Sequence, residues 1–314
     1  MRYNVSEINP DYDFDIVGAS YAGNPVSGTA MYITKKVEKL MDNLIGISDC
    51  LVFIETGMEP EAVLKKYNCF VSSDNPQMSY AHFMEKFEME RFKEEAERNY
   101  EFVKGYYIGE NVRIGEDAYI EPGCLIGHDV RIGDYCRIMT GSVIKNAIIG
   151  DYFVCGENAV VGANGFTMAE DKQGNKVRIP TLGKVIIGNH VEIGHLDSIC
   201  VGQGGNTIIH DYVKIDSLVY IGHDAKLGKN TEIPAGVIVG GYVETGNKAY
   251  MGINSVIRNR VKIGAESVVG MGAVVTKSVP DFSTVVGNPA KLFHKNNVDI
   301  ELQGLKKNKN TERT

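Results

Sequence analysis

Residues 209–241 read IHDYVKIDSLVYIGHDAKLGKNTEIPAGVIVGG, with an aliphatic residue at every sixth position. A second column, two residues earlier in each repeat, holds mostly small or β-branched residues, so both columns face the same side of a strand. Glycine often follows the aliphatic residue, as at Gly222 and Gly228, and lets the chain turn where a Cβ would clash. Helical periodicity cannot produce this pattern. Each hexad is therefore one short strand followed by one tight corner.

The six-residue step extends over more than half of the chain. Three hexads close a triangular coil of 18 residues, and coils stack at about 4.8 Å, the ordinary spacing of paired strands. We therefore predict a mainly β protein in which residues 106–278 form a parallel β-helix with a solid interior, so that chemistry must use outward side chains. The column holds Ile108, Ile114, Ile120, Ile126, Ile132, Ile138 and Ile144, then Ile149, Cys155 and Val161, then Ile187, Ile193 and Ile199, and every sixth residue from Ile209 to Val275, among which Thr245 is polar.

Segments without this step flank the β-helix. Residues 1–76 mix strand-like pieces with a helical piece at Lys35–Leu44 and predict a small α/β domain. Residues 77–105 carry three phenylalanines at roughly helical spacing and predict an amphipathic linking helix, whose charges are those of a structural spacer. Residues 279–314 provide a cap and a basic tail. The three phenylalanines are Phe83, Phe87 and Phe92, and the tail contains Lys306, Lys307 and Lys309.

Two interruptions break the step inside the β-helix. Residues 164–183, here called the excursion, form a polar loop of a length that is commonly functional. Residues 202–206 (GQGGN), here called the glycine loop, form a second slip.

Composition limits the class of function. The net charge of −7 argues against a nucleic-acid partner, because a phosphate-binding surface needs a basic excess. No apolar run approaches the roughly 20 residues that span a bilayer, and the polar N-terminus lacks a signal-peptide core. We expect a cytoplasmic protein. The 6 cysteines form no CxxC pair, so we expect neither disulfides nor a metal site.

One histidine stands out from the repeat. His223 lies two residues after Ile221, beside a corner, and Gly240 and Gly241 follow one coil later. A histidine beside exposed glycine N–H groups suits acyl transfer, because the imidazole can take a proton and an N–H can stabilise an oxyanion. The alternative is a surface corner residue. Nucleotide P-loop, Rossmann and Gly-x-Ser-x-Gly motifs are all missing from the sequence.

The stretch from Gly162 to Gly228 resembles the UDP-3-O-acylglucosamine N-acyltransferases and related enzymes that acylate nucleotide-linked amino sugars. The resemblance implies a left-handed β-helix, a homotrimer with active sites between chains, His223 as general base and Gly241 as oxyanion donor. It also implies direct transfer without an acyl-enzyme. The matching pieces are GANGF from Gly162, KVRIP from Lys176, Leu182-Gly183, residues 185–188 and 191–194, and VKIDSLVYIGHDAKLG from Val213.

Further site residues follow from nearness in sequence or from the resemblance. Asp216 or Asp224 is the candidate that orients the imidazole. Tyr32 matches the first of two aromatic residues that hold uracil in the family, although Lys35 and Glu38 replace the other two family residues there. Asn164 and Phe166 are the remaining candidates for acceptor binding.

The donor is assigned from the C-terminal part of the chain. Residues 285–291 (VVGNPAK) resemble the closing motif of coenzyme A-dependent hexapeptide acetyltransferases. We therefore expect acyl-coenzyme A as co-substrate, with no bound cofactor. Its candidate contacts are Gly240, Arg258, Arg260 and Lys291.

Three functional hypotheses remain open. The first is N-acyl transfer, of an acetyl or short acyl group, from coenzyme A to the amine of a nucleotide-linked amino sugar, for cell-envelope polysaccharide or glycan synthesis. The second is the lipid A enzyme with an acyl-carrier protein as donor, against which Lys35, Glu38 and Cys200 count. The third is a hexapeptide-fold zinc hydratase using His190 and His195, but Val154 occupies the position where a further histidine is needed. A purely structural scaffold would leave His223 unexplained.

Overall fold

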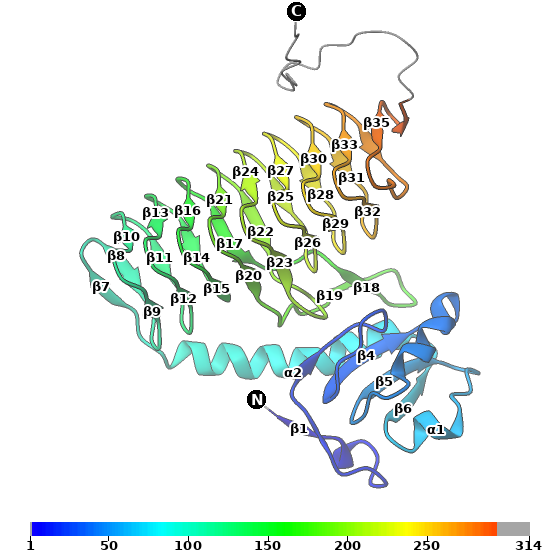
Figure 1. Ribbon diagram of the computed structural model, residues 1–314. Helices are drawn as coiled ribbons and strands as arrows, with labels where there is room; N and C mark the ends of the chain where they lie inside the picture. The colour runs from blue at the N-terminus through cyan, green and yellow to red at the C-terminus, as the bar shows by residue number, and fades with distance from the viewer. Residues whose placement is uncertain (1, 294–314) are drawn as a thin grey trace, which may run out of the picture.

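The structure is a computed structural model that describes residues 2–293. His294 and the tail lysines lie outside the described residues. A long triangular prism dominates the molecule, with a small domain beside its lower edge and a long helix between them (Figure 1). Leu125 pairs in parallel with Val143, 18 residues later, as the hexad step predicts. The mainly β, parallel hexapeptide-repeat fold is confirmed, and its left-handed sense stays a prediction.

Each side of the prism is one sheet, numbered here in the order of the lists that follow. The first sheet contains β10 (Tyr119–Ile120), β13 (Arg137–Ile138), β16 (Val154–Cys155), β21 (Glu192–Ile193), β24 (Lys214–Ile215), β27 (Glu232–Ile233), β30 (Tyr250–Met251), β33 (Val268–Val269), β35 (Thr284–Val286) and β36 (Lys291–Leu292). The second contains β34 (Val274–Val275), β31 (Val256–Ile257), β28 (Ile238–Val239), β25 (Tyr220–Ile221), β22 (Ser198–Cys200), β17 (Val160–Ala163), β14 (Val143–Ile144), β11 (Leu125–Ile126), β8 (Tyr106–Ile108) and β7 (Glu101–Val103). The third contains β32 (Lys262–Ile263), β29 (Glu244–Thr245), β26 (Lys226–Leu227), β23 (Thr207–Ile209), β20 (Val185–Ile187), β15 (Ala147–Ile149), β12 (Arg131–Ile132) and β9 (Arg113–Ile114).

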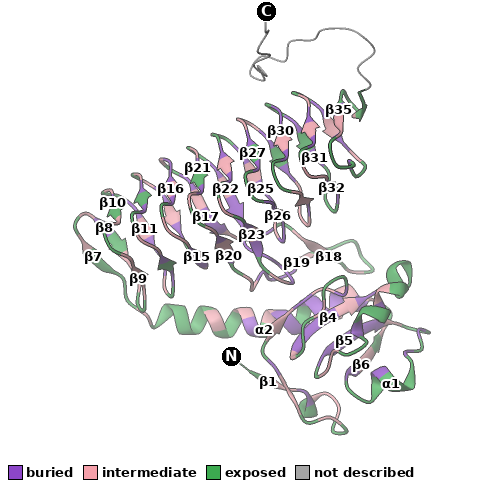
Figure 2. Ribbon diagram, in the orientation of Figure 1, coloured by how far each residue is buried: buried purple, intermediate pink, exposed green. Residues whose placement is uncertain are grey.

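The aliphatic column fills the interior of the prism. Most of its members are buried, and Figure 2 shows buried residues along the strands of every coil. Thr245, the polar member, is accommodated because its hydroxyl accepts a hydrogen bond from Gly228 N (2.8 Å) and lies 3.1 Å from the hydroxyl of Thr231. Cys124, Cys136 and Cys155 occupy inward positions and are buried like the aliphatic residues.

One buried threonine gives a stability prediction. Thr207 in β23 is fully buried, and its hydroxyl has no hydrogen-bond partner among residues 2–293. An unsatisfied buried hydroxyl costs about 1–3 kcal/mol. We expect Thr207→Val to raise the free energy of unfolding by about 1 kcal/mol, measured by urea or thermal unfolding. Thr231→Val is the matched control and should lower the stability, because the Thr231 hydroxyl donates to Gly228 O (2.7 Å). A less stable Thr207→Val variant would contradict the expectation.

The small N-terminal domain is built around a parallel sheet, β3 (Gly18–Ala19), β4 (Thr29–Ile33), β5 (Leu51–Glu55) and β6 (Cys69–Ser73). Its other elements are the paired β1 (Tyr3–Asn4) and β2 (Asp15–Ile16), the 3₁₀ helices η1 (Val5–Glu7) and η2 (Lys35–Leu44), and α1 (Ala62–Lys65). The predicted helical piece is thus a 3₁₀ helix, which is kinked at Val37. Among the described helices, none is long and apolar enough to cross a membrane.

The linking helix is shorter than predicted. It is α2 (Pro76–Ala96), with Asn75 as its N-cap. Residues 101–103, expected to be helical, form β7, which pairs antiparallel with β8 at the end of the prism. Phe83 and Phe87 are buried, as predicted for the apolar face, whereas Phe92 is exposed. The helix packs against the N-terminal domain with its first half and leaves that domain in its second half (Figure 2).

The excursion was predicted to be a loop, and this was wrong. It contains an antiparallel hairpin of β18 (Met168–Glu170) and β19 (Lys176–Arg178), which reaches from the prism to the N-terminal domain (Figure 1). Ala169 and Ile179 are fully buried in the same core as Phe83 and Phe87. The N-terminal core therefore includes residues from the middle of the chain, and its packing gives the hairpin its order.

Candidate active site

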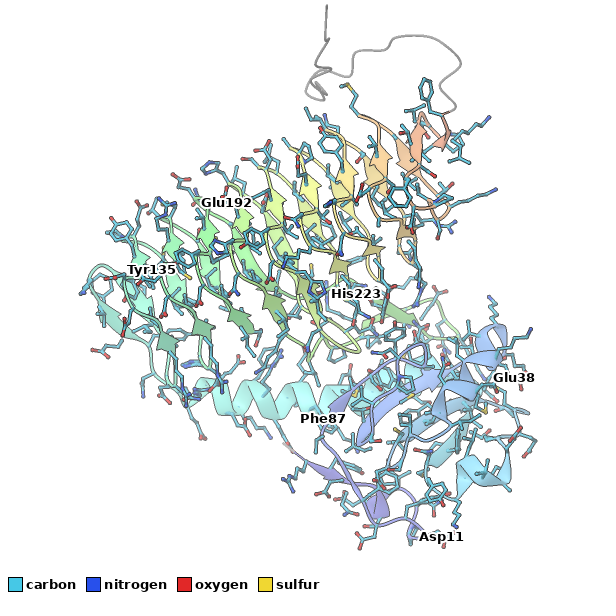
Figure 3. The ribbon with its side chains drawn as sticks, in the orientation of Figure 1. Asp11, Glu38, Phe87, Tyr135, Glu192 and His223 are labelled. Carbon is cyan, nitrogen blue, oxygen red and sulfur yellow. The ribbon has the colours of Figure 1, made fainter. Side chains whose placement is uncertain are left out.

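His223 lies at a corner of the second side of the prism, directly after β25 and Gly222. Figure 3 labels it on the edge of the prism that faces the N-terminal domain. Its side chain is only 12% exposed. Asp224, the next residue, has a positive φ of 58°, which turns its side chain back beside the imidazole. The corner thus brings two neighbouring residues into a hydrogen-bonded pair.

Hydrogen bonds fix the orientation of the imidazole at its Nδ1 atom. His223 Nδ1 lies 2.9 Å from Asp224 Oδ2, and the carboxylate also accepts hydrogen bonds from Gln203 N (2.7 Å) and Gly204 N (3.3 Å). Since a carboxylate only accepts, Nδ1 carries the proton and Nε2 is the acceptor nitrogen. The glycine loop is therefore what fixes the carboxylate that orients His223.

Asp216, the other predicted partner of His223, is not in the site. It is exposed at a corner that follows β24 in the first sheet, and its carboxylate accepts from Ser217 N (2.7 Å). No hydrogen bond joins it to His223 in the described part of the chain. Nearness in sequence misled here, because successive corners of the prism belong to different edges.

The other ring nitrogen meets a residue that sequence reasoning missed. His223 Nε2 lies 3.0 Å from Oγ1 of Thr167, which comes from the excursion. The backbone of Gly241 closes on the same nitrogen, since a Cβ added there would lie 2.6 Å from Nε2. Position 241 therefore requires glycine, because the side chain of any other residue would clash with the imidazole of His223.

Backbone N–H groups are left without partners at this corner. At some other corners the N–H is accepted by a side chain one coil later, as Glu110 N is by His128 Nδ1 (2.8 Å) and Lys229 N is by Asn247 Oδ1 (3.0 Å). At others, such as Asn259, the N–H has no partner within residues 2–293. One coil after His223 stands Gly241, which has no side chain. Neither the His223 N–H nor the Gly241 N–H has a hydrogen-bond partner within residues 2–293. Such donors can stabilise an oxyanion.

An aromatic cluster closes the side that faces the N-terminal domain. The Tyr242 ring lies edge-on to His223 (5.1 Å between centroids) and against Tyr21 (4.8 Å), and the Arg260 guanidinium lies 4.2 Å from its centroid. Burial and the charge of Asp224 raise the pKa of Tyr242, so its phenol stays neutral. Sequence reasoning missed Tyr21 and Tyr242, because neither belongs to a motif.

Tyr32, predicted to hold a nucleobase, lies close to this cluster. It contacts Tyr80 (5.3 Å between ring centroids), and its hydroxyl accepts from Gln77 Nε2 (3.4 Å). Burial raises the pKa of Tyr32, and the charge of Arg260 opposes that rise. Glu38, by contrast, is exposed on the far side of the N-terminal domain (Figure 3). Tyr32 thus lies on the side toward Arg260 of the prism, and Glu38 does not.

The remaining predicted residues are spread along the chain. Asn164 is exposed at the base of the excursion, where its side-chain oxygen accepts from the Thr181 hydroxyl (3.2 Å). Phe166 is 71% exposed, with the Arg178 guanidinium 5.1 Å from its ring centroid. Gly240 adjoins Gly241. Arg258 and Lys291 are exposed, and no hydrogen bond or ion pair joins them to His223 in residues 2–293.

A cleft between α2 and the prism has Asn164 among its lining residues. It has a volume of about 480 Å³. Its lining includes the cationic side chains of Arg91, Arg98, Lys145 and Lys184 and the carboxylates of Glu94, Glu95 and Asp129. Lysine and arginine side chains can bind phosphate groups.

The histidines of the zinc hypothesis have other contacts. His190 is stacked between Tyr152 and Tyr212, with ring centroids 4.6 and 4.7 Å away. His195 contacts the Glu157 carboxylate. Val154 pairs with Glu192 on the next coil, because the excursion lies between them in the sequence. In the same register, the residue one coil before His190 is Tyr152, which stacks on it. This arrangement does not favour the hydratase.

Comparison with known proteins finds the same repeat in acyltransferases. The family model for bacterial transferase hexapeptide (six repeats) matches residues 111–146 and 206–241, and the second match contains His223 and Gly241. UDP-3-O-acylglucosamine N-acyltransferase 2 of Legionella pneumophila (strain Lens) is 43% identical over 102 residues, which are 32% of this chain and 29% of that protein. A probable mitochondrial UDP-3-O-acylglucosamine N-acyltransferase 2 of Arabidopsis thaliana is 34% identical over 151 residues, 48% of this chain and 50% of that protein.

Solved structures agree on the fold. The UDP-N-acetylglucosamine acyltransferase from Campylobacter jejuni superposes with a TM-score of 0.55 at 25% identity, covering 62% of this chain and 74% of that one. The UDP-N-acetylglucosamine acyltransferase from Bacteroides fragilis gives a TM-score of 0.56 at 21% identity. The match again covers 62% of this chain and 74% of that one. The chain spans about a fifth to a half of the length of the curated relatives it matches. Its resemblance to hexapeptide-repeat acyltransferases is confirmed.

Proposed function

We propose that this chain is an N-acyltransferase that moves an acyl group, acetyl or another short chain, from a coenzyme A thioester to the amine of a nucleotide-linked amino sugar. The observation that carries the proposal is the His223–Asp224 pair, with hydrogen bonds to both ring nitrogens of His223, beside the unpaired N–H of Gly241. A base and an oxyanion donor at one corner are what acyl transfer needs. The names of the curated relatives support an acyl acceptor of this class.

The chemistry follows from the geometry. The acceptor amine attacks the thioester carbonyl carbon, and the proton that the amine loses ends on His223. The Asp224 carboxylate, 2.9 Å from Nδ1, stabilises the imidazolium that forms. The Gly241 N–H donates to the oxyanion of the tetrahedral intermediate. That intermediate collapses with loss of the thiol, so no acyl-enzyme is formed.

Substrate binding is proposed on both sides of His223. Tyr32 would hold the nucleotide of the acceptor, and Asn164 and Phe166 would contact its sugar. Arg258, Arg260 and Lys291 would bind coenzyme A, with the backbone of Gly240 beside the thioester. Both substrates carry phosphate groups, and Lys145 and Lys184 in the cleft that includes Asn164 offer a further place for them.

A second candidate is the lipid A reaction itself, with UDP-3-O-acylglucosamine as acceptor and an acyl-carrier protein as donor. The names of the curated relatives favour it. Lys35 and Glu38 differ from the residues expected at the uracil site, and the exposed position of Glu38 leaves it without a role in base stacking.

One assay separates these candidates. The purified chain would be given a panel of nucleotide-linked amino sugars with acetyl-coenzyme A, and UDP-3-O-acylglucosamine with acyl-carrier protein, and products would be identified by mass spectrometry. Amide formation from coenzyme A supports the first candidate. Turnover with the carrier protein alone supports the second. If the chain acylates no amine in either arm, the proposed function is wrong.

We also propose a homotrimer, as the resemblance implies, and the second sheet supports association with further copies. Its outward side chains are mostly apolar, whereas the other two sheets carry many charged residues outward. Ile238 and Val256, neighbours on this face, are 39% and 38% exposed. The face leads to the corner that holds His223, so a second copy there would border the site. The outward residues are Tyr107, Leu125, Val143, Val160, Ser198, Tyr220, Ile238, Val256 and Val274.

A charge on this face should break the assembly. We expect the native protein to have about three times the 34.5 kDa mass of one chain in light scattering, and the Val256→Glu variant to run as a smaller species. The reason is that a carboxylate would have to be buried without a partner. Glu232→Ala, at the outward position of β27 in the first sheet, is the matched control and should leave the mass unchanged. A trimeric Val256→Glu variant would place the interface elsewhere.

A further inference from the structure

The ring nitrogen of His223 that would receive the proton is already engaged by a hydroxyl. Nδ1 is committed to Asp224, and Nε2 lies 3.0 Å from Thr167 Oγ1. Because an imidazole that is protonated at Nδ1 accepts at Nε2, Thr167 is the donor in this hydrogen bond. Its oxygen keeps two lone pairs that can accept a hydrogen bond from a substrate N–H.

His223 itself has little room to meet an acceptor. Its side chain is 12% exposed, the Gly241 backbone closes on Nε2, and the Tyr242 ring lies edge-on to the imidazole. Gly165 restricts the other end, since a Cβ added there would lie 3.0 Å from His223 Cβ. Thr167 is half-buried, as is His223, and its hydroxyl lies on the Nε2 side of the imidazole.

The hairpin holds Thr167 where it is. The Thr167 carbonyl accepts from Ile179 N (2.9 Å), and the carbonyl of the next residue, Met168, accepts from Gln77 Nε2 (3.3 Å). Ala169 and Ile179 are fully buried in the N-terminal core. The backbone of Thr167 therefore cannot move away from His223 without pulling these residues toward water, and only rotation of its side chain about Cα–Cβ would take the hydroxyl from Nε2. The anchored backbone keeps the hydroxyl within reach of Nε2, and the hydrogen bond between them is already the contact that a proton relay requires.

We propose that Thr167 is a catalytic residue that relays the proton of the acceptor to His223, an inference that rests on the proposed function. As the amine nitrogen bonds to the thioester carbon, its proton passes to Thr167 Oγ1, and the hydroxyl proton of Thr167 passes to His223 Nε2. The C–S bond then breaks, and the imidazolium returns one proton by the same path to the leaving thiolate. The products are an amide and a thiol, and Thr167 is never acylated.

Two substitutions at position 167 test the relay. Thr167→Val keeps the shape of the side chain but has no hydroxyl, and we expect kcat to fall on the order of 10²-fold, with the KM of the acceptor changed less than about threefold. Thr167→Ser restores a hydroxyl and should recover most of kcat. A proton inventory in mixtures of H₂O and D₂O should show two protons in motion for the wild type and for Thr167→Ser.

The controls separate the relay from the rest of the mechanism. Thr207→Val makes the same exchange at a buried site outside the active centre and should keep wild-type kcat. If His223→Ala is inactive while Thr167→Val turns over as fast as the wild type or faster, the relay is wrong and the proposed function stands. If the wild type acylates no amine in the substrate panel, the proposed function and the relay fall together.

Discussion

Replacing His223 with alanine is expected to lower kcat for acyl transfer by about 10³-fold, the range in which a positioned general base contributes. The imidazole is the group to which the proton of the amine is transferred, and Asp224 at 2.9 Å prepares it for that role. The variant should still fold, because the side chain lies at a corner and outside the aliphatic column. Steady-state kinetics with saturating donor and circular dichroism would measure both properties.

His210→Ala is the matched control for this substitution. His210 follows the aliphatic residue of β23 at another corner and is exposed. Its loss should leave kcat within about twofold of the wild type, because the base contribution belongs to His223. Near-normal turnover by the His223→Ala variant would show that His223 is only a surface corner residue.

The second large effect is expected for Asp224→Asn, which should lower kcat on the order of 10²-fold. The amide has no negative charge to stabilise the imidazolium. It also cannot satisfy its three neighbours, because Gln203 N, Gly204 N and His223 Nδ1 all donate to the carboxylate. One donor must therefore face the NH₂ group, or His223 must shift its proton to Nε2. We expect a loss of stability of about 1–3 kcal/mol as well.

Asp216→Asn makes the same chemical change at the exposed corner on another edge of the prism. It should alter neither kcat nor the unfolding midpoint, because within residues 2–293 the Asp216 carboxylate accepts a hydrogen bond from Ser217 N alone. Similar losses of activity in the two variants would mean that total charge, and not contact with His223, is what matters.

Much of the prism could be predicted from the sequence, because each coil repeats the same local rule. The spacing between His223 and Gly241 translates directly into neighbours on adjacent coils, since 18 residues make one turn. The close approach of the two is confirmed, as a Cβ at position 241 would lie 2.6 Å from Nε2. The same count separates Asp216 from Asp224, because Asp216 follows Ile215 at one corner, whereas Asp224 follows Ile221 at the next corner, beside His223.

Residues outside the repeat were harder to place. The excursion looked like a polar loop, yet Ala169 and Ile179 in it are fully buried. Their burial depends on the N-terminal domain, which lies far away in the chain. The C-terminal part of the predicted helix became β7 because an antiparallel strand partner, β8, was available at the end of the prism.

The sequence by itself determined the prism and the corner at which His223 stands, because a six-residue step leaves one way to bury its aliphatic column. Only the tertiary structure decided what touches the imidazole. Thr167 is 56 residues from His223 and reaches it because its hairpin is anchored in the core of another domain. Asp224 is fixed by the glycine loop of a neighbouring coil. Such contacts depend on how non-repeating segments pack, and no periodic pattern encodes them.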